Sequence, residues 1–80
     1  MIHGYYGIYD SVAKSYCYIG ESKSKETFAR MCEIMAKDNK TFLGQSPEDY
    51  KGYHLANFDD ENGRFESIEP DKVWEGRQHE

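Results

Sequence analysis

The chain has 80 residues, enough for one domain with a small core, because a chain of this length buries only about 60% of the surface that its unfolded form exposes. Its 10 basic and 15 acidic side chains give a net charge of −5, which argues against a general electrostatic attraction to DNA phosphates. No apolar run approaches the roughly 20 residues that a membrane-spanning helix needs, so we expect a soluble protein with no membrane partner.

The first predicted element is a β-hairpin. Residues 2–9 are rich in tyrosine and predict a strand, residues 10–14 predict a turn, and residues 15–20 predict a second strand. We expect the two strands to lie side by side and antiparallel.

A helix is predicted after this hairpin. Ser22 or Ser24 can cap its start, and the helical pattern runs to about Asp38. Apolar side chains recur at helical spacing along one face, at Phe28, Met31, Cys32 and Met35. This face is the one that we expect to pack on the sheet.

The second half of the chain predicts one helical turn and another hairpin. The turn begins at Ser46, whose hydroxyl can cap it and which a proline follows. Residues 53–58 alternate in the manner of a strand, Asn62-Gly63 supplies the positive φ of a tight turn, and residues 65–68 form the returning strand.

The element order is therefore ββαββ, which predicts an α+β fold with a four-stranded antiparallel sheet and one helix packed on one face. The order of the strands in the sheet stays open. After the second hairpin, residues 71–74 are expected to form a last turn that lays Val73 and Trp74 on the sheet. We place a single α+β domain at residues 1–74 and a polar C-terminal tail at residues 75–80.

Tyrosine is the most overrepresented residue type, and its members lie in or near predicted strands: Tyr5, Tyr6, Tyr9, Tyr16, Tyr18, Tyr50 and Tyr53. Aromatic rings on an exposed sheet face can stack with unpaired bases. They also pack well against one another, and a single helix covers only one face of a sheet. The alternative to base stacking is therefore a homodimer contact or ordinary core packing.

Basic side chains are concentrated in the first half of the chain, where residues 1–40 carry six basic and five acidic groups, against four and ten in residues 41–80. The predicted nucleic-acid surface lies there and consists of Lys14, Tyr16, Tyr18, Lys23 and Lys25. In it, lysines at the first turn and at the start of the helix bind phosphates, and the two tyrosines between them stack on bases. The alternative is an ordinary solvated surface.

Metal-binding and catalytic patterns are weak. Cysteine and histidine occur at positions 3, 17, 32, 54 and 79, and none of the spacings is that of a zinc site. Cys17 and His3 fall on adjoining predicted strands, but nothing identifies a group that orients the histidine or stabilises an oxyanion. We expect no metal, no cofactor and no enzymatic activity. Two cysteines are also too few for a disulfide framework and fit a reducing cytoplasm.

Two segments of the chain carry a family resemblance. Residues 8–13 read IYDSVA and are followed by Tyr16, whereas residues 46–70 combine a Pro-Glu-Asp-Tyr sequence, a Phe-Asp pair, a turn ending in Gly63 and a closing proline. In this order and spacing they closely resemble the small nonstructural protein of gokushoviruses, tailless single-stranded DNA phages of the microvirus group. The resemblance covers most of the chain. It departs from the family pattern at Ala56-Asn57, where Gly-Glu is expected before the Phe-Asp pair, and in the composition of the turn.

The resemblance implies a noncatalytic accessory protein that acts in the cytoplasm of the infected bacterial host, during synthesis or packaging of the single-stranded genome. Its implied partners are single-stranded DNA and a phage or host replication protein. The alternative is an interaction or sequestering protein, a homodimer that captures a host protein or a small ligand. DNA binding would depend on the lysines of the first half, whereas partner capture would depend on the acidic second half.

Overall fold

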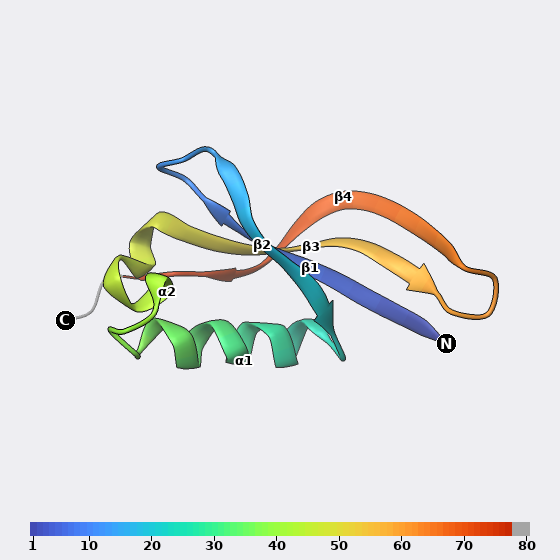
Figure 1. The fold of residues 1–80 in the computed structure, drawn as a ribbon, viewed down its shortest axis with the longest axis horizontal. Coiled ribbons are helices and arrows are strands. Elements are labelled where there is room, and N and C mark those ends of the chain that lie inside the picture. Colours follow the sequence, from blue (N-terminus) through green and yellow to red (C-terminus); the bar gives the residue numbers. More distant parts are fainter. Residues whose placement is uncertain (78–80) are drawn as a thin grey trace.

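Residues 1–77 are described in a computed structural model of the chain (Figure 1). Its strands and helices follow the predicted order. They are β1 (Ile2–Asp10), β2 (Ser15–Ser22), α1 (Lys25–Ala36), α2 (Phe42–Gln45), the 3₁₀ turn η1 (Pro47–Asp49), β3 (Tyr50–Asp59) and β4 (Arg64–Glu75).

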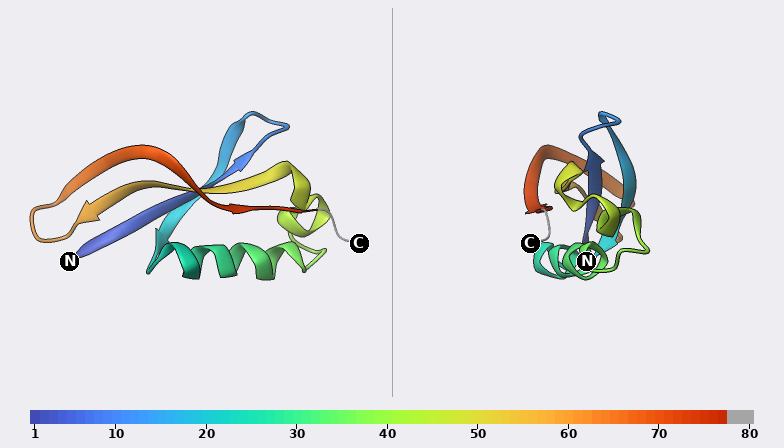
Figure 2. Two further views of the ribbon diagram at one scale, coloured as in Figure 1. Left: turned by 180° about the vertical axis from the view of Figure 1, so that it is seen from behind. Right: turned by 90° about the vertical axis from the view of Figure 1, so that its left-hand side faces the viewer.

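The strands form one antiparallel sheet in the order β2-β1-β3-β4, with α1 on one face, which confirms the predicted α+β fold. The first strands of the two hairpins are neighbours at the centre of the sheet. The sheet twists strongly, and the β3–β4 hairpin extends beyond the end of α1 (Figures 1 and 2). The result is an elongated molecule that measures 45 × 23 × 17 Å along its principal axes. Within residues 1–77 neither helix is long and apolar enough to cross a membrane.

Each hairpin turn begins with an aspartate whose carboxylate accepts hydrogen bonds from the backbone of the turn. Asp10 Oδ1 accepts from the backbone N–H of Val12 at 2.9 Å, and Asp59 Oδ1 accepts from that of Glu61 at 2.9 Å. Gly63 closes the second turn with a φ of 71°, a left-handed conformation that glycine adopts at little cost. Local side-chain chemistry therefore accounts for both predicted turns.

α1 begins at the Ser24 cap, one of the two predicted candidates. The Ser24 side chain accepts from the backbone N–H of Thr27 at 3.1 Å. The buried face of the helix is Phe28, Cys32 and Ala36. Met31 and Met35, which we expected on this face, are only partly buried and pack at its margins.

The core lies between α1 and the helix-facing side of the sheet, and its remaining members are Tyr6, Ile8, Leu43 and Trp74. The Phe28 ring stacks on that of Tyr6 at a centroid distance of 5.0 Å. Gly52 on β3 leaves the space that this ring occupies, because a Cβ atom there would lie 2.8 Å from Phe28. The Trp74 indole Nε1–H donates to Glu33 Oε1 at 2.8 Å, which ties β4 to the helix.

The structure corrects our prediction for residues 71–74, which continue β4 rather than form a separate turn. The predicted strand stopped at Ile68 because of Pro70. In fact the pairing with β3 skips from Ser67 to Asp71, so the proline sits in a bulge of an edge strand, where it removes no ladder hydrogen bond. Trp74 thus reaches the core from a strand.

Two further segments differ from the expected connections. Residues 41–45 were predicted as a simple link, but they include α2, which Thr41 caps by accepting from the Gly44 N–H at 3.0 Å. At the C-terminal end, Gly76 is buried and its N–H donates to the Tyr50 carbonyl at 3.0 Å. The first two residues of the predicted tail at 75–80 are therefore part of the fold, because Glu75 ends β4 and Gly76 is buried. The last three residues of the tail, 78–80, lie outside the described residues.

Replacing Phe28 by alanine should lower the free energy of unfolding by about 3–5 kcal/mol, because the ring is 2% exposed and fills the contact between α1 and the sheet. Urea unfolding followed by circular dichroism measures the change. The control is Ile34→Ala on the same helix, where the side chain is 64% exposed and the expected effect is within about 0.5 kcal/mol. Equal urea midpoints for the two variants would contradict the assigned core.

Candidate nucleic-acid interface

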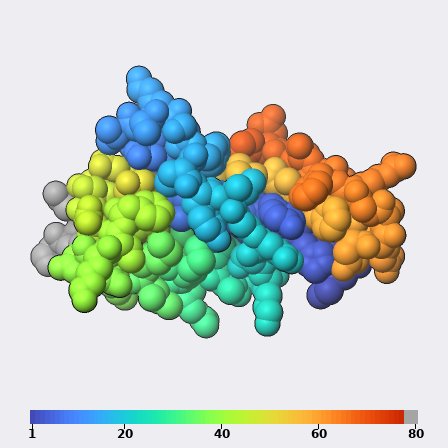
Figure 3. Space-filling view, viewed as in Figure 1, coloured from blue at the N-terminus to red at the C-terminus, as the bar shows by residue number. Residues whose placement is uncertain are grey.

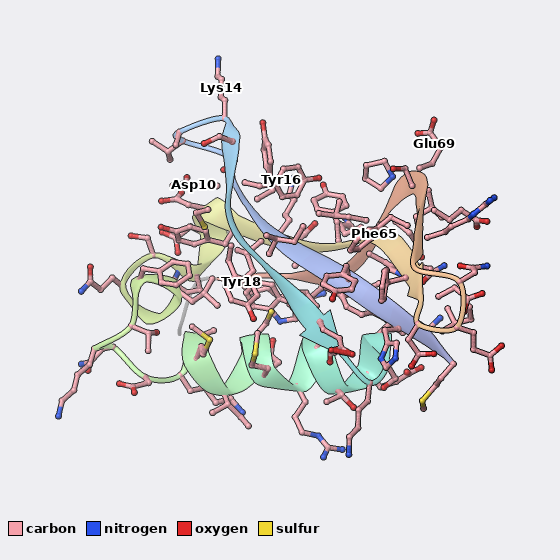
Figure 4. The ribbon with its side chains drawn as sticks, turned by 45° about the vertical axis from the view of Figure 1, so that its right-hand side comes forward. Asp10, Lys14, Tyr16, Tyr18, Phe65 and Glu69 are labelled. Carbon is pink, nitrogen blue, oxygen red and sulfur yellow. The ribbon has the colours of Figure 1, made fainter. Side chains whose placement is uncertain are left out.

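A bulge in β2 separates the two tyrosines of the predicted surface. Tyr16 pairs with Tyr9 of β1 and Tyr18 pairs with Ile8, so Cys17 is an extra residue between the two pairs. Since Ile8 and Tyr9 point to opposite faces of the sheet, their partners do too. Ile8 is in the core, so Tyr18 lies on the helix side, whereas Tyr16 lies on the face that points away from α1 (Figure 4).

We call the face that points away from α1 the open face. Its apolar side chains come from all four strands: Tyr5, Tyr9, Tyr16, Ile19, Tyr53, Leu55, Phe58 and Phe65. They form a strip along the length of the sheet. Phe65 and Ile19 are 63% and 64% exposed, so the strip is available to a ligand or a partner.

Three tyrosines form a cluster at one end of the open face. The ring centroid of Tyr16 lies 5.1 Å from that of Tyr9 and 6.1 Å from that of Tyr53, and both pairs meet edge to face. Gly7 lies beneath them, where a Cβ atom would be 3.1 Å from Tyr16 and 2.7 Å from Leu55. The absence of a side chain at Gly7 therefore lets the rings settle directly on the sheet.

Tyr16 is the most accessible member of this tyrosine cluster, with 42% of its surface exposed. Partial burial raises the pKa of Tyr16 above its ordinary value of 10.0, and the neighbouring hydroxyls of Tyr53 and Tyr9 raise it further. The ring is consequently neutral at pH 7 and presents an uncharged aromatic surface. Beside it, a shallow depression of about 360 Å³ extends along β2 to Ile19 and is bordered by Leu55.

Two lysines border the tyrosine cluster, and sequence reasoning missed both. Lys51 pairs with Tyr9 across β1 and β3, and Lys72 pairs with Tyr53 across β3 and β4, so each shares a face with its tyrosine. Lys72 Nζ donates to Glu75 Oε1 at 2.7 Å, and this hydrogen bond raises the pKa of Lys72. Both lysines therefore lie on the same face of the sheet as the tyrosine cluster.

The predicted lysines do not form one cluster. Lys14 lies in the β1–β2 turn with a left-handed φ of 58°, and it projects to the same side as Tyr16 (Figure 4). Lys23 and Lys25 lie at the far end of β2, where it enters α1. Lys25 lines a depression with Lys72 and with the acidic side chains Glu26 and Asp71. The structure therefore brings Lys14 and Tyr16 together at one end of the strand and leaves Lys23 and Lys25 at the other.

At the opposite end of the open face, a histidine side chain lies between two carboxylates from other segments of the chain. His3 Nδ1 contacts the Glu21 carboxylate, and His3 Nε2 lies 2.8 Å from Asp60 Oδ2. The N-terminal ammonium of Met1 also binds Asp60 Oδ1, at 2.7 Å. Hydrogen bonds to Asp60, and then to Glu21, raise the pKa of His3 above 6.5. The His3 side chain thus links β1 to β2 and to the β3–β4 turn.

Because the pKa of His3 differs between the folded and the unfolded chain, the stability of the fold should depend on pH. The pKa of His3 is higher in the folded state than its unfolded value of about 6.5. The contribution of His3 to the free energy of unfolding is therefore fully present below pH 6.5, and it is lost as the pH rises through the folded-state pKa. The urea midpoint of the wild type should therefore fall relative to that of His3→Gln between pH 6 and pH 8. A constant difference between the two midpoints over this range would show that His3 is not held as an imidazolium.

The cysteines are placed unfavourably for catalysis. Burial raises the pKa of the Cys32 thiol to about 12. Cys17 Sγ donates to the Ile8 carbonyl at 3.5 Å, and partial burial raises its pKa as well. His3 lies near the other end of β1, engaged with its carboxylates. Among residues 1–77, no three His, Cys, Asp or Glu side chains are grouped so that they could hold a metal ion.

Comparison with known proteins gives a family for this chain. The family model described as Phage ORF5 protein matches residues 3–79. The chain belongs to the Phage ORF5 protein family. Searches of curated proteins and of solved structures gave no match. Membership confirms that this is a phage protein, and it extends over nearly all the residues that form the sheet and its helix.

Proposed function

We propose that this Phage ORF5 family member is a noncatalytic accessory protein that binds single-stranded DNA on its open face. It acts in the cytoplasm of the infected bacterium during synthesis or packaging of the viral genome. The sequence motifs shared with the small nonstructural protein of gokushoviruses support this finer placement, because those phages carry single-stranded DNA.

The observation that supports the proposal best is the tyrosine cluster of Tyr9, Tyr16 and Tyr53 with lysines at its border. Aromatic rings contribute about 1–3 kcal/mol per stacked base, and this stacking tolerates any sequence. Because only unpaired bases offer a free face, the cluster favours single strands over duplexes. The net charge of −5 adds little attraction for a duplex.

Tyr16→Leu should weaken binding of a labelled oligothymidylate by about 5- to 100-fold, since it removes one stacking ring and keeps an apolar side chain. The matched control is Tyr18→Leu on the same strand, where the ring is 39% exposed but faces the helix side. We expect little change for this variant. Fluorescence anisotropy at low salt provides the measurement. A loss confined to Tyr18→Leu would move the site to the other face.

The salt dependence of oligonucleotide binding shows which lysines contact phosphates. Replacing Lys14, Lys51 and Lys72 together by glutamine should reduce the slope of log K against log salt by up to about 2, at roughly 0.7 for each phosphate that the variant no longer neutralises. Replacing Lys23 and Lys25 should leave the slope near that of the wild type. If only the second variant flattens the slope, the phosphates bind Lys23 and Lys25 at the start of α1, which are two of the three lysines of the predicted surface.

A second candidate function is capture of a basic partner, such as a phage or host replication protein. The observation that favours it is the acidic β3–β4 hairpin, which projects past α1 and carries Asp59, Asp60, Glu61, Glu66 and Glu69. Absence of oligonucleotide binding by the wild type at low salt would favour this alternative. This second candidate function predicts that replacing Glu61, Glu66 and Glu69 by glutamine abolishes recovery of the partner from infected cells.

A further inference from the structure

An exposed aromatic ring lies on the open face outside the tyrosine cluster. Phe65 pairs with Phe58 of β3, which pairs with His3 of β1, and all three lie on the same face as Tyr5. Phe65 is 63% exposed, the largest exposed fraction of any phenylalanine, tyrosine or tryptophan side chain in residues 1–77. Its hairpin forms an end of the molecule that α1 does not reach (Figure 3). Packing of the core therefore does not account for an aromatic side chain at this position.

Two neighbouring rings hold the Phe65 ring in place. The ring centroid of Tyr5 lies 5.3 Å from that of Phe65, with an interplanar angle of 64°. The ring centroid of Phe58 lies 4.6 Å from that of Phe65, with the planes tilted by 43°. Such aromatic contacts favour particular ring orientations. The Phe65 ring is thus oriented by its neighbours and still exposed to a ligand, so it loses little side-chain freedom when a base stacks on it.

We propose that Phe65 is a second base-stacking site for the single strand of DNA that the tyrosine cluster binds, so that one strand lies along β3 and contacts both places. This inference rests on the proposed function. It adds that the site has two separated aromatic contacts and that its ligand must be long enough to reach both.

The distance between the two places suits a short oligonucleotide. Tyr53 belongs to the tyrosine cluster, Phe58 contacts Phe65, and both residues lie on the open face of β3. At about 3.3 Å per residue of a strand, they are separated by about 15 Å. A single strand with about 3.4 Å between stacked nucleotides covers this distance in about five nucleotides, and a more extended strand covers it in fewer.

The side chains between the two places are small. Ala56 of β3 pairs with Ser67 of β4, and both lie on the open face with Tyr5. Glu69 projects from the edge strand β4 beyond them (Figure 4). The phosphates of a bound strand are therefore best placed over β1 and β3, away from the Glu69 carboxylate.

The carboxylates at the Phe65 end of the open face each have a cation beside them. Glu21 and Asp60 both contact His3, whose pKa these contacts raise. The N-terminal ammonium of Met1 lies 2.7 Å from Asp60 Oδ1 and 3.8 Å from Glu61 Oε1. These cations offset the negative charges that would otherwise oppose a phosphate backbone near Phe65.

A substitution series at Phe65 tests the second stacking site. Phe65→Leu keeps an apolar side chain, and it should weaken binding of a labelled oligothymidylate of about twelve residues by about fivefold or more. Phe65→Trp keeps an aromatic ring and should retain the wild-type affinity. The matched control is Phe42→Leu on α2, where the ring is 40% exposed but lies away from the open face, and we expect no change. Fluorescence anisotropy at low salt measures the affinities, and circular dichroism checks that each variant is folded.

The length of the strand tests whether one molecule reaches both places. Dithymidylate is too short to do so, and in competition with the labelled strand it should bind the wild type and Phe65→Leu within about twofold of each other. A wild type that binds no oligonucleotide would contradict the proposed function and this inference together. Binding that Tyr16→Leu weakens and Phe65→Leu does not would overturn this inference alone. Equal losses in Phe65→Leu and Phe65→Trp would also overturn it, because the ring would then not act by stacking.

Discussion

The contact of Phe28 with Tyr6 and Gly52 is the interaction on which the rest of the structure depends. It fixes α1 on one side of the central strands, and the other core residues gather around it. A chain of this length has apolar side chains for one such core only. Covering one face of the sheet with the helix therefore leaves the other face for contacts with other molecules. The open face, proposed above to bind DNA, is the face that the helix leaves uncovered.

Much of the fold could be predicted because its determinants are local. The Ser24 cap, the Asn62-Gly63 turn and the apolar spacing of α1 each act within a few residues. The strand order could not be predicted, since it depends on contacts between β1 and β3 that no short pattern encodes. The extent of β4 was also missed, because Pro70 reads as a strand end unless its place in an edge bulge is known.

The candidate site was predicted less well, for a related reason. Tyr16 and Tyr18 alternate as if they shared a face, but the extra residue Cys17 turns them to opposite sides. Lys51 and Lys72 lie far from Tyr16 in sequence, and they come onto the same face as the tyrosine cluster only through the pairing of β1, β3 and β4. Counting the basic residues in each half of the chain cannot detect a surface to which both halves contribute.

The β3–β4 hairpin beyond α1 lies outside the reach of the helix and has no core of its own. It is stabilised by ring contacts such as Phe58 with Phe65 and by the carboxylates around His3 at the surface. Its backbone hydrogen bonds should open more often than those beside Phe28, without unfolding of the whole chain. The half of the sheet beside α1 should therefore be the more rigid one, whereas the β3–β4 hairpin should be freer to change its curvature.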